Sequence, residues 1–285
     1  MSKSNRRFND SPREDPWYEH PLRIVELIND FGEAACVSSD PAGELDDRLA
    51  MHANAEHMHT MGQPLSLDTM FFKTSARIKD QPDRLAEHVK IARERGIRVI
   101  VYLNVHWGSD KHPEWSQRLA NGDLAIAGYG SGLYICANGG FRETAKRLIG
   151  DLGRYDIDGV FLDGPMFIQD GCYCDVCRHF LKERYGAEMP TPPFDDRSLY
   201  AKWLEFRADS LASFCDEMTT ALKCVNPYAI LYCNANGLMP PGSTGRDNRK
   251  LLRHMEILAA EGGFIFYVQP NKVPIWKPGA AALVK

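Results

Sequence analysis

The fold is decided by residues 141–165, which read FRETAKRLIGDLGRYDIDGVFLDGP and join a helix to a strand. Ala145, Leu148, Ile149 and Leu152 have the spacing of one apolar helix face, which predicts a helix over 141–155. A short link leads to the apolar strand Val160–Asp163, which Gly164-Pro165 ends. A helix that runs directly into a buried strand is typical of a parallel sheet covered by helices.

The same unit recurs along the chain. A helix over 83–95 ends before Gly96, and the clearest buried strand follows at 98–105. Outward from these units, the pattern predicts strands at 22–28, 56–61, 229–234 and 257–261, and helices at 45–55, 199–225 and 249–255. No G-x-G-x-x-G follows the first strand, so the sequence does not favour an open dinucleotide-binding sheet.

Polar side chains recur at the ends of several predicted strands, and this favours a TIM-type (β/α)8 barrel. They are His57, His59, Asn104, His106, Asp163, Asn234, Asn236 and Glu261. About six β/α units are visible, and only 24 residues follow Glu261. Two further units would need on the order of 60 residues. Either two strand segments are undetected, with one of them around residues 34–38, or one barrel domain over 21–285 stops before closure, which is the interpretation we favour. The exposed strand edges would then be covered by a partner, by a swapped copy as in a homo-oligomer, or by the missing segment.

Composition excludes several other classes of protein. The 285 residues are 44% hydrophobic and 25% charged, which is typical of a soluble globular protein. A net charge of −4 gives no excess of basic residues for binding nucleic acid, and no apolar run approaches the roughly 18 residues of a membrane span. Residues 1–20 are expected to be a flexible polar leader without the apolar core of a secretory signal, so the cytoplasm is the expected compartment.

Asp163 is the first candidate for catalysis. It ends an apolar strand, where the barrel would hold its carboxylate at the mouth, and Gly164 leaves room for a ligand. Such a carboxylate can attack the anomeric carbon of a sugar, and glycoside cleavage then needs a second carboxyl group as proton donor. Glu261 is our candidate for that second group because it ends the last strand-like run; Glu256, Asp110 and Asp170 compete for the role.

Other polar and aromatic residues near the strand ends are candidates for binding substrate. His57, His59, His106, Asn104, Asn234 and Asn236 could bond sugar hydroxyl groups, and Trp107 could stack on a pyranose ring. Alternatively, the histidines could be satisfied within the barrel mouth. A third hypothesis is a metal-dependent hydrolase that uses His57, His59, His106 and Asp163, since His57-Met-His59 has the H-x-H spacing of such enzymes.

Three cysteines lie close together in the predicted loop just after the Asp163 strand: Cys172, Cys174 and Cys177. In a cytosolic protein such a cluster indicates a metal before a disulfide, and thiolates suit tetrahedral zinc. The fourth ligand is expected to be Cys136, which follows the third strand on the same barrel face, with His179 as the alternative. Four protein ligands would make this zinc structural. The competing interpretation is three reduced cysteines without metal.

These stretches resemble a known family. Residues 134–142 (YICANGGFR), 155–165 (YDIDGVFLDGP), 172–180 (CYCDVCRHF) and 183–186 (ERYG) resemble the barrel proteins called hypothetical glycosyl hydrolase 6, a group that includes α-L-fucosidase-like enzymes. The cysteine pattern is similar to the zinc cluster of bacterial β-galactosidases, in which an upstream cysteine like Cys136 completes the site. The FLDG segment resembles the nucleophile strand of α-L-fucosidases.

This resemblance implies a function. It implies a glycosidase with Asp163 as nucleophile and an acid/base at the end of the sixth strand, where Glu261 stands. Family members continue with further strands beyond the point where this chain stops. We therefore expect a retaining glycoside hydrolase-like protein that acts on a carbohydrate such as an α-L-fucoside or a galactoside. The alternative is a barrel that binds carbohydrate or serves as a scaffold, with the zinc but without turnover.

Overall fold

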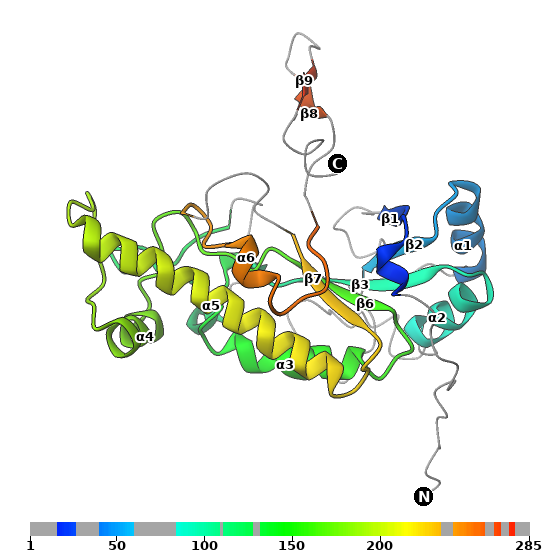
Figure 1. Cartoon of the computed structure of the whole chain (residues 1–285), viewed down its shortest axis with the longest axis horizontal. Helices are drawn as coiled ribbons and strands as arrows, with labels where there is room; N and C mark the ends of the chain where they lie inside the picture. Colours follow the sequence, from blue (N-terminus) through cyan, green and yellow to red (C-terminus); the bar gives the residue numbers. More distant parts are fainter. Residues whose placement is uncertain are drawn as a thin grey trace, which may run out of the picture.

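A five-stranded parallel sheet forms the centre of the protein (Figure 1). The computed structural model describes residues 16–26, 40–59, 84–108, 111–127, 132–234, 242–259, 265–268 and 274–276. The strands lie side by side in the order β1 (Ile24–Glu26), β2 (Ala55–His59), β3 (Arg98–Asn104), β6 (Gly159–Asp163) and β7 (Ile230–Cys233). Each neighbouring pair is parallel, as the apolar strands predicted.

The order of the strands distinguishes an open, doubly wound parallel sheet from the sheet of a β/α barrel. It follows the order of the chain, whereas a doubly wound sheet reverses its order at a switch point, and the described sheet has no such reversal. An isolated parallel bridge from Asn234 to Ala259 places the next part of the chain beside β7. The α/β class with a parallel sheet is thus confirmed, while closure into a barrel stays a prediction.

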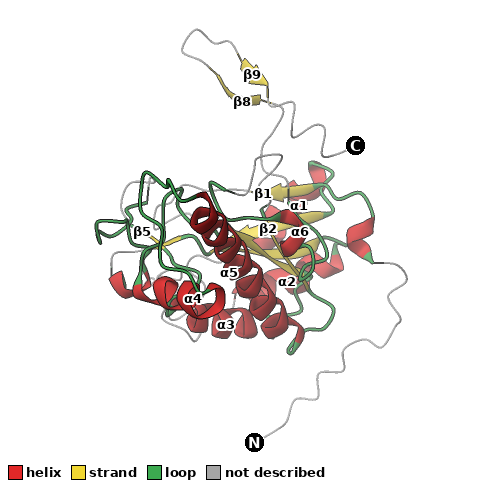
Figure 2. Ribbon diagram, turned by 60° about the vertical axis from the view of Figure 1, so that its left-hand side comes forward, coloured by secondary structure: helices red, strands yellow, loops and turns green. Residues whose placement is uncertain are grey.

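Along the sequence, the helices alternate with the strands, and most of them lie close to the positions that the sequence predicts. Their bounds are α1 (Pro41–Ala50), α2 (Arg84–Glu94), α3 (Phe141–Leu152), α4 (Asp175–Tyr185), α5 (Arg197–Lys223) and α6 (Asn248–Leu251). Figures 1 and 2 show α3 and α5 packed side by side. The sequence did not predict α4. It also placed α1 four residues too late and the C-terminal end of α6 four residues too far.

Local chemistry explains where these helices begin and end. The side chain of Asp40 accepts a hydrogen bond from the Gly43 amide at 2.9 Å, and that of Asp196 accepts one from the Leu199 amide at 3.0 Å. These bonds satisfy amide groups that the first helical turn leaves free. Gly96 after α2 and Gly186 after α4 have φ values of 71° and 57°, which glycine adopts without steric cost.

The two faces of the sheet have different surroundings. On one face, Glu56 of β2 contacts Arg48 of α1 and His88 of α2, so this face lies against the helices. The opposite face carries His57, Tyr102, Phe161 and Tyr232, which we call the aromatic layer. Phe161 stacks on His57 at a ring separation of 4.6 Å and lies 5.7 Å from Tyr102 and 5.2 Å from Tyr232. Asp163 is two residues beyond Phe161 and so belongs to this second face.

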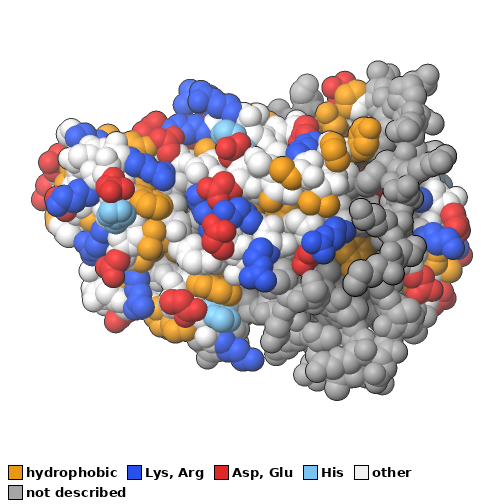
Figure 3. Space-filling model, turned by 90° about the horizontal axis from the view of Figure 1, so that it is seen from below, with side chains coloured by type: hydrophobic (Ala, Val, Ile, Leu, Met, Phe, Trp, Pro, Cys, Tyr) orange, Lys and Arg blue, Asp and Glu red, His pale blue; other side chains and the backbone are white. Residues whose placement is uncertain are grey.

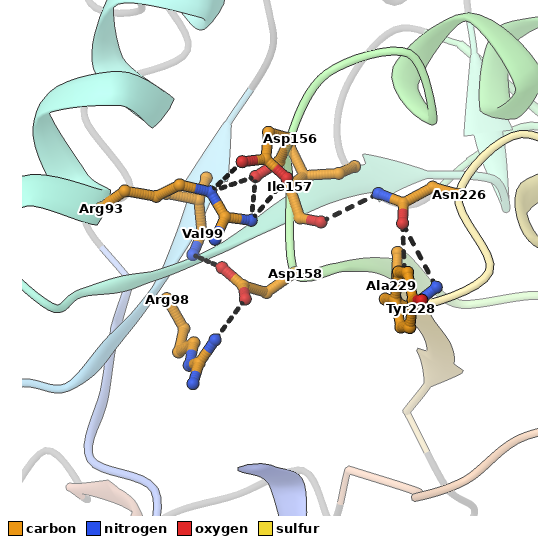
Figure 4. Close-up of polar contacts among 9 residues, drawn as sticks. All are labelled: Arg93, Arg98, Val99, Asp156, Ile157, Asp158, Asn226, Tyr228 and Ala229. Atoms are coloured by element: carbon orange, nitrogen blue, oxygen red, sulfur yellow. Dashed lines mark hydrogen bonds and ion pairs between the residues drawn. The ribbon is translucent and has the colours of Figure 1, made fainter. Parts of the chain in front are cut away.

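The link 156–159 ties the sheet together at the amino-terminal ends of β3, β6 and β7 (Figure 4). Asp158 accepts hydrogen bonds from the Val99 amide at 3.0 Å and from Arg98 at 2.8 Å. Asn226 donates to the Ile157 carbonyl at 3.1 Å and accepts from the amides of the Tyr228–Ala229 turn. These acidic and amide side chains stabilise the end of the sheet opposite Asp163.

Smaller elements complete the description. They are the turns η1 (Trp17–Glu19) and η2 (Pro113–Trp115), and two antiparallel pairs, β4 (Trp107–Gly108) with β5 (Leu133–Tyr134) and β8 (Ile265–Val268) with β9 (Pro274–Trp276). Trp17, within the segment expected to be a polar leader, is buried. No helix in the described part of the chain is long and apolar enough to cross a membrane. Among the described residues, basic and acidic side chains are interspersed on the face shown in Figure 3.

Candidate functional site

Asp163 lies at the carboxyl end of β6 and is held by side chains from both neighbouring strands. Its Oδ1 accepts a hydrogen bond from Asn234 Nδ2 at 2.9 Å, and its Oδ2 accepts one from the Tyr102 hydroxyl. The side chain keeps 18% of its surface exposed. Two directional bonds therefore fix the carboxylate, while part of it remains open to a ligand.

The turn after Asp163 is shaped by Gly164. This residue has a φ of 71°, and its amide donates to Asn234 Oδ1 at 2.9 Å. A Cβ atom at this position would lie 2.7 Å from Cγ of His106, closer than real Cβ contacts come. Glycine is required here both for its backbone conformation and for the close approach of the His106 ring.

His106 is oriented toward Asp163 but does not form a tight pair with its carboxylate. Its Nδ1 lies 3.1 Å from the Asp163 carbonyl oxygen and 4.0 Å from Oδ2. Because a carbonyl only accepts, Nδ1 carries the proton in this contact, and Nε2 of the neutral ring is then an acceptor. Asn104 Oδ1 accepts from the amides of His106 and Trp107 at 3.1 and 3.3 Å, so Asn104 shapes the turn that presents them.

His57 lies deeper on the same face of the sheet. Its Nδ1 is 2.7 Å from Glu26 Oε2, its Nε2 contacts the Tyr232 hydroxyl, and its ring is buried on Phe161. With both ring nitrogens engaged, His57 has no free atom for a metal. This weakens the hypothesis of a metal-dependent hydrolase. The side chain of His59, the other histidine of the H-x-H pair, lies outside the described part of the structure.

Four residues are candidates for the second carboxyl group expected at this site. Glu261 and Asn236 lie outside the described residues, as does the competing Asp110. Of the other competitors, Glu256 forms an ion pair with Lys223 at 2.6 Å, and Asp170 is exposed in the loop before the cysteines. The last described residue before Glu261 is Ala259, which pairs with Asn234, the partner of Asp163.

Four cysteines come together, as the sequence predicted. A ligand atom from each of Cys136, Cys172, Cys174 and Cys177 lies within 4.8 Å of the others. The sulfur of Cys136 is 3.5 Å from that of Cys177 and 3.7 Å from that of Cys174. Four sulfurs around a tetrahedral zinc, with Zn–S bonds of about 2.3 Å, are about 3.8 Å apart. The four cysteines can bind a metal ion.

Two expectations about this cluster need correction. His179, the alternative fourth ligand, is not part of it; its side chain is 61% exposed and pairs with Glu183. The cysteines do not all lie in a loop either, because Cys174 is the N-cap of α4 and Cys177 lies in its first turn. The helix was missed because its apolar pattern is short, and it begins at the ligand cluster.

The surroundings of the cluster favour the thiolate form at one of the four cysteines. The Arg118 amide donates to Cys172 Sγ at 3.3 Å, and Asn138 donates to Cys177 Sγ at 3.4 Å. Hydrogen bonds from the neighbouring thiols lower the pKa of Cys174, whereas bonding to those thiols and burial raise the pKa of Cys136 and of Cys177. A thiolate is the form that binds metal, so one ligand of the four is already favoured in that form.

Gln117 links the cysteine cluster to the Asp163 loop, a role that the sequence did not predict. Gln117 is fully buried, and its Nε2 donates to the carbonyls of Ile135 at 2.9 Å and Met166 at 2.8 Å. Its Oε1 accepts from the Ile168 amide at 2.9 Å. The next residue, Arg118, bonds Cys172. No local motif announces this role, because the partners are backbone groups up to 51 residues away.

Tyr102 was also missed, although a signal for it exists. It precedes Asn104 by two residues in β3, so alternation places it on the face of the strand that carries the proposed site. The prediction of a buried strand over 98–105 gives Tyr102 no separate role.

Comparisons with known proteins agree with the resemblance expected from the sequence. The family model described as "Hypothetical glycosyl hydrolase 6" matches residues 45–164. No curated protein sequence matches the chain.

Solved structures show a similar fold at low sequence identity. An α-L-fucosidase isoenzyme 2 from Paenibacillus thiaminolyticus is 17% identical with a TM-score of 0.58, over 83% of this chain and 35% of its own. A β-galactosidase from Halorubrum lacusprofundi is 14% identical with a TM-score of 0.63, over 84% of this chain and 39% of its own. The PgaB (BpsB) glycoside hydrolase domain from Bordetella bronchiseptica is 15% identical with a TM-score of 0.64, over 84% of this chain and 73% of its own. The chain thus spans well under half the length of the first two proteins.

Proposed function

We propose that this chain is a retaining glycoside hydrolase in which Asp163 is the nucleophile. The observation that carries the proposal is the partly exposed carboxylate at the end of β6, held by Tyr102 and Asn234. The match to a glycosyl hydrolase family model over the segment that ends at Gly164 supports it. The substrate is a carbohydrate, with α-L-fucosides and galactosides as the first to test because the similar structures include an α-L-fucosidase and β-galactosidases.

The reaction needs two carboxyl groups in complementary roles. One oxygen of Asp163 attacks the anomeric carbon as the bond to the leaving oxygen breaks, and a protonated carboxyl group gives that oxygen its proton. The resulting glycosyl ester is then hydrolysed by a water that the second group, now a carboxylate, deprotonates. Each Asp163 oxygen can accept more than one hydrogen bond, so Tyr102 and Asn234 can keep their contacts as substrate enters.

Glu261 is our candidate for the acid/base. Support comes from sequence spacing: Ala259 pairs with Asn234, and a residue two positions further along a strand returns to the same face. Retention requires the two carboxyl groups to be about 5–5.5 Å apart. His106 and Trp107, on the turn beside Asp163, are candidates for binding the sugar.

The sheet fits the barrel that such an enzyme needs. Its strand order follows the chain, and the bridge at Ala259 continues the same progression beyond β7. We propose that the sheet belongs to a (β/α)8-type barrel, whose sites form at the carboxyl ends of the strands, where Asp163 lies.

We further propose that the four cysteines bind one structural zinc ion. The donor set fits, because four sulfurs converge and soft thiolates favour zinc. Four protein ligands leave no open position for substrate, so the metal would hold α4 and the residue 172–174 loop against the Cys136 turn. Zinc content per chain tests this: Cys174→Ser should lose the metal, and Cys224→Ser, at an exposed cysteine, should keep about one zinc.

The test of the nucleophile is chemical rescue. Aryl glycosides, including the α-L-fucoside and the β-galactoside, should be hydrolysed by the wild-type chain and by Asp195→Asn, a control at an exposed acid shortly before α5. Asp163→Gly should be inactive, and azide should restore turnover by forming a glycosyl azide of inverted configuration, because the small anion replaces the missing nucleophile. Undiminished hydrolysis in Asp163→Asn would exclude the role. Sugar binding without turnover in the wild-type chain would favour the scaffold alternative.

A further inference from the structure

Arg246 is a buried cation with few partners among the residues that the structure describes. It lies just before α6 and is 8% exposed. Nη1 donates to the Asn234 carbonyl at 3.2 Å, Nη2 reaches the Met166 sulfur at 3.7 Å, and Nε is buried without a partner. No acidic side chain among the described residues forms an ion pair with it. A guanidinium has five N–H donors, and one of them makes an ordinary hydrogen bond to an oxygen of the described residues.

The other buried arginines of the described chain are compensated. Arg48 pairs with the buried carboxylate of Glu56. Arg207 also lacks a carboxylate and has an unpartnered Nε, but its two terminal nitrogens bond four carbonyls, those of Ile168, Gln169, Gly242 and Ser243. Its guanidinium also lies over the Trp203 ring at 4.6 Å. Arg207 thus has a complete structural role that Arg246 lacks.

The position of Arg246 connects it to the proposed site. Asn234, whose carbonyl it bonds, donates its side-chain amide to Asp163 at 2.9 Å. Met166, its other contact, is three residues beyond Asp163 in the same loop. The incompletely bonded guanidinium therefore flanks the residue proposed to attack the sugar.

We propose that Arg246 binds a carboxylate of the substrate, so that the sugar recognised beside Asp163 is a uronic acid unit. This inference rests on the proposed function and names its substrate class. Burying a charge without a partner costs free energy that an incoming anion recovers. A planar carboxylate matches the guanidinium fork, which can hold it through two parallel hydrogen bonds. A neutral sugar would leave the buried charge uncompensated.

A competing role is purely local: Arg246 could hold the Asn234 carbonyl and so position Asp163. The two roles differ in selectivity. A group that positions Asp163 affects neutral and acidic sugars alike, whereas a group that binds the carboxylate affects only the acidic ones.

The experiment measures binding of matched ligands to the full chain carrying Asp163→Asn, which prevents turnover. The probes are the methyl glycosides of glucuronic and galacturonic acid in both anomers, each compared with its uronamide and with its neutral parent hexoside. We expect a uronide to bind about 10- to 100-fold more tightly than its uronamide, the range of a charged hydrogen bond. Arg246→Gln should remove this preference, and Arg246→Lys should keep part of it. Arg249→Gln, at an exposed arginine of α6, should leave it unchanged.

Several results would overturn the inference. They are equal binding of uronides and uronamides, binding of none of the probes, or an Arg246→Gln variant that weakens acidic and neutral ligands equally. If that variant does not fold, as circular dichroism would show, the uronide–uronamide comparison with Arg246 intact decides. Uronide preference without hydrolysis or azide rescue would refute the proposed function and leave the anion site standing. Hydrolysis without uronide preference would refute the anion site and leave the proposed function standing.

Discussion

Substituting Gly164 by alanine tests the local geometry that places Asp163. Two costs add at this position. An L-residue at a φ of 71° costs about 1–2 kcal/mol, partly offset by the reduced entropy of the unfolded chain. The added Cβ would also lie 2.7 Å from Cγ and 3.0 Å from Cβ of the buried His106, and forcing apart packed groups costs about 1–3 kcal/mol. We expect a total loss of about 2–4 kcal/mol in the free energy of unfolding.

Gly96 provides a matched control for this substitution. It has the same φ of 71°, and a Cβ atom there would meet nothing within 4 Å. Gly96→Ala therefore carries the backbone cost alone, and the difference between the variants isolates the His106 contact at about 1–3 kcal/mol. Urea unfolding at equal m-values measures both. Equal destabilisation of the two variants would refute the steric argument.

The same pair of variants links the turn to function. His106 Nδ1 bonds the Asp163 carbonyl, so displacing the ring should shift the proposed nucleophile. A displacement of about 1 Å can cost on the order of 100-fold in rate. We expect hydrolysis of the best aryl glycoside to fall by about that factor in Gly164→Ala and to be unchanged in Gly96→Ala. Full activity in a folded Gly164→Ala variant would contradict the proposed importance of this turn.

Three further predictions concern other groups. Tyr102→Phe removes a hydrogen bond to the Asp163 carboxylate and should lower kcat/KM by about 10- to 100-fold, whereas Tyr228→Phe, at an exposed tyrosine, should not change it. Burial raises the pKa of Tyr185 above its ordinary 10.0, and the hydrogen bond to Asp209 raises it further. The contribution of Tyr185 to stability is therefore complete below pH 10 and is lost as the pH rises above that value. Urea unfolding between pH 8 and 11 should show this decline, with a smaller slope in Tyr185→Phe. Removing zinc with a chelator should lower the melting temperature, because a metal at about 1,000 times its Kd stabilises by about 4 kcal/mol, and the Cys174→Ser variant should not respond to the chelator.

Much of the fold was predictable because its signals are local. The strand 98–105 and the helices that end at Gly96 and near Gly153 were predicted within a few residues, since apolar periodicity and glycine stops lie within single segments. The antiparallel pair β4–β5 was not predicted. Each of its strands has two residues, too few for a periodic pattern, and its pairing joins segments 26 residues apart.

The candidate site was predictable to the extent that its residues follow strands. The cysteine cluster and its fourth member, Cys136, were identified because spacing and strand order bring them to one edge of the sheet. The partners of Asp163 were assigned differently: Asn234 was expected to bind sugar, whereas its amide bonds Asp163 and the Gly164 backbone. Sequence marks which residues reach an edge of a sheet, but which of them bond each other depends on side-chain geometry.

The buried Gln117 and its neighbour Arg118 connect the four cysteines to the loop that follows β6, which gives a physical reason for a metal cluster at this place. Gln117 bonds the backbone of Met166 and Ile168, which lie in the loop after Asp163. The amide of the next residue, Arg118, bonds Cys172. The match to the family model ends at Gly164, before Cys172, Cys174 and Cys177. The geometry of the four sulfurs is therefore the observation that supports a metal ion. Fixing Cys172 also fixes residues 117–118, and through them the loop after the proposed nucleophile. A zinc ion without catalytic function would therefore still influence catalysis, because losing it would loosen the turn that orients Asp163.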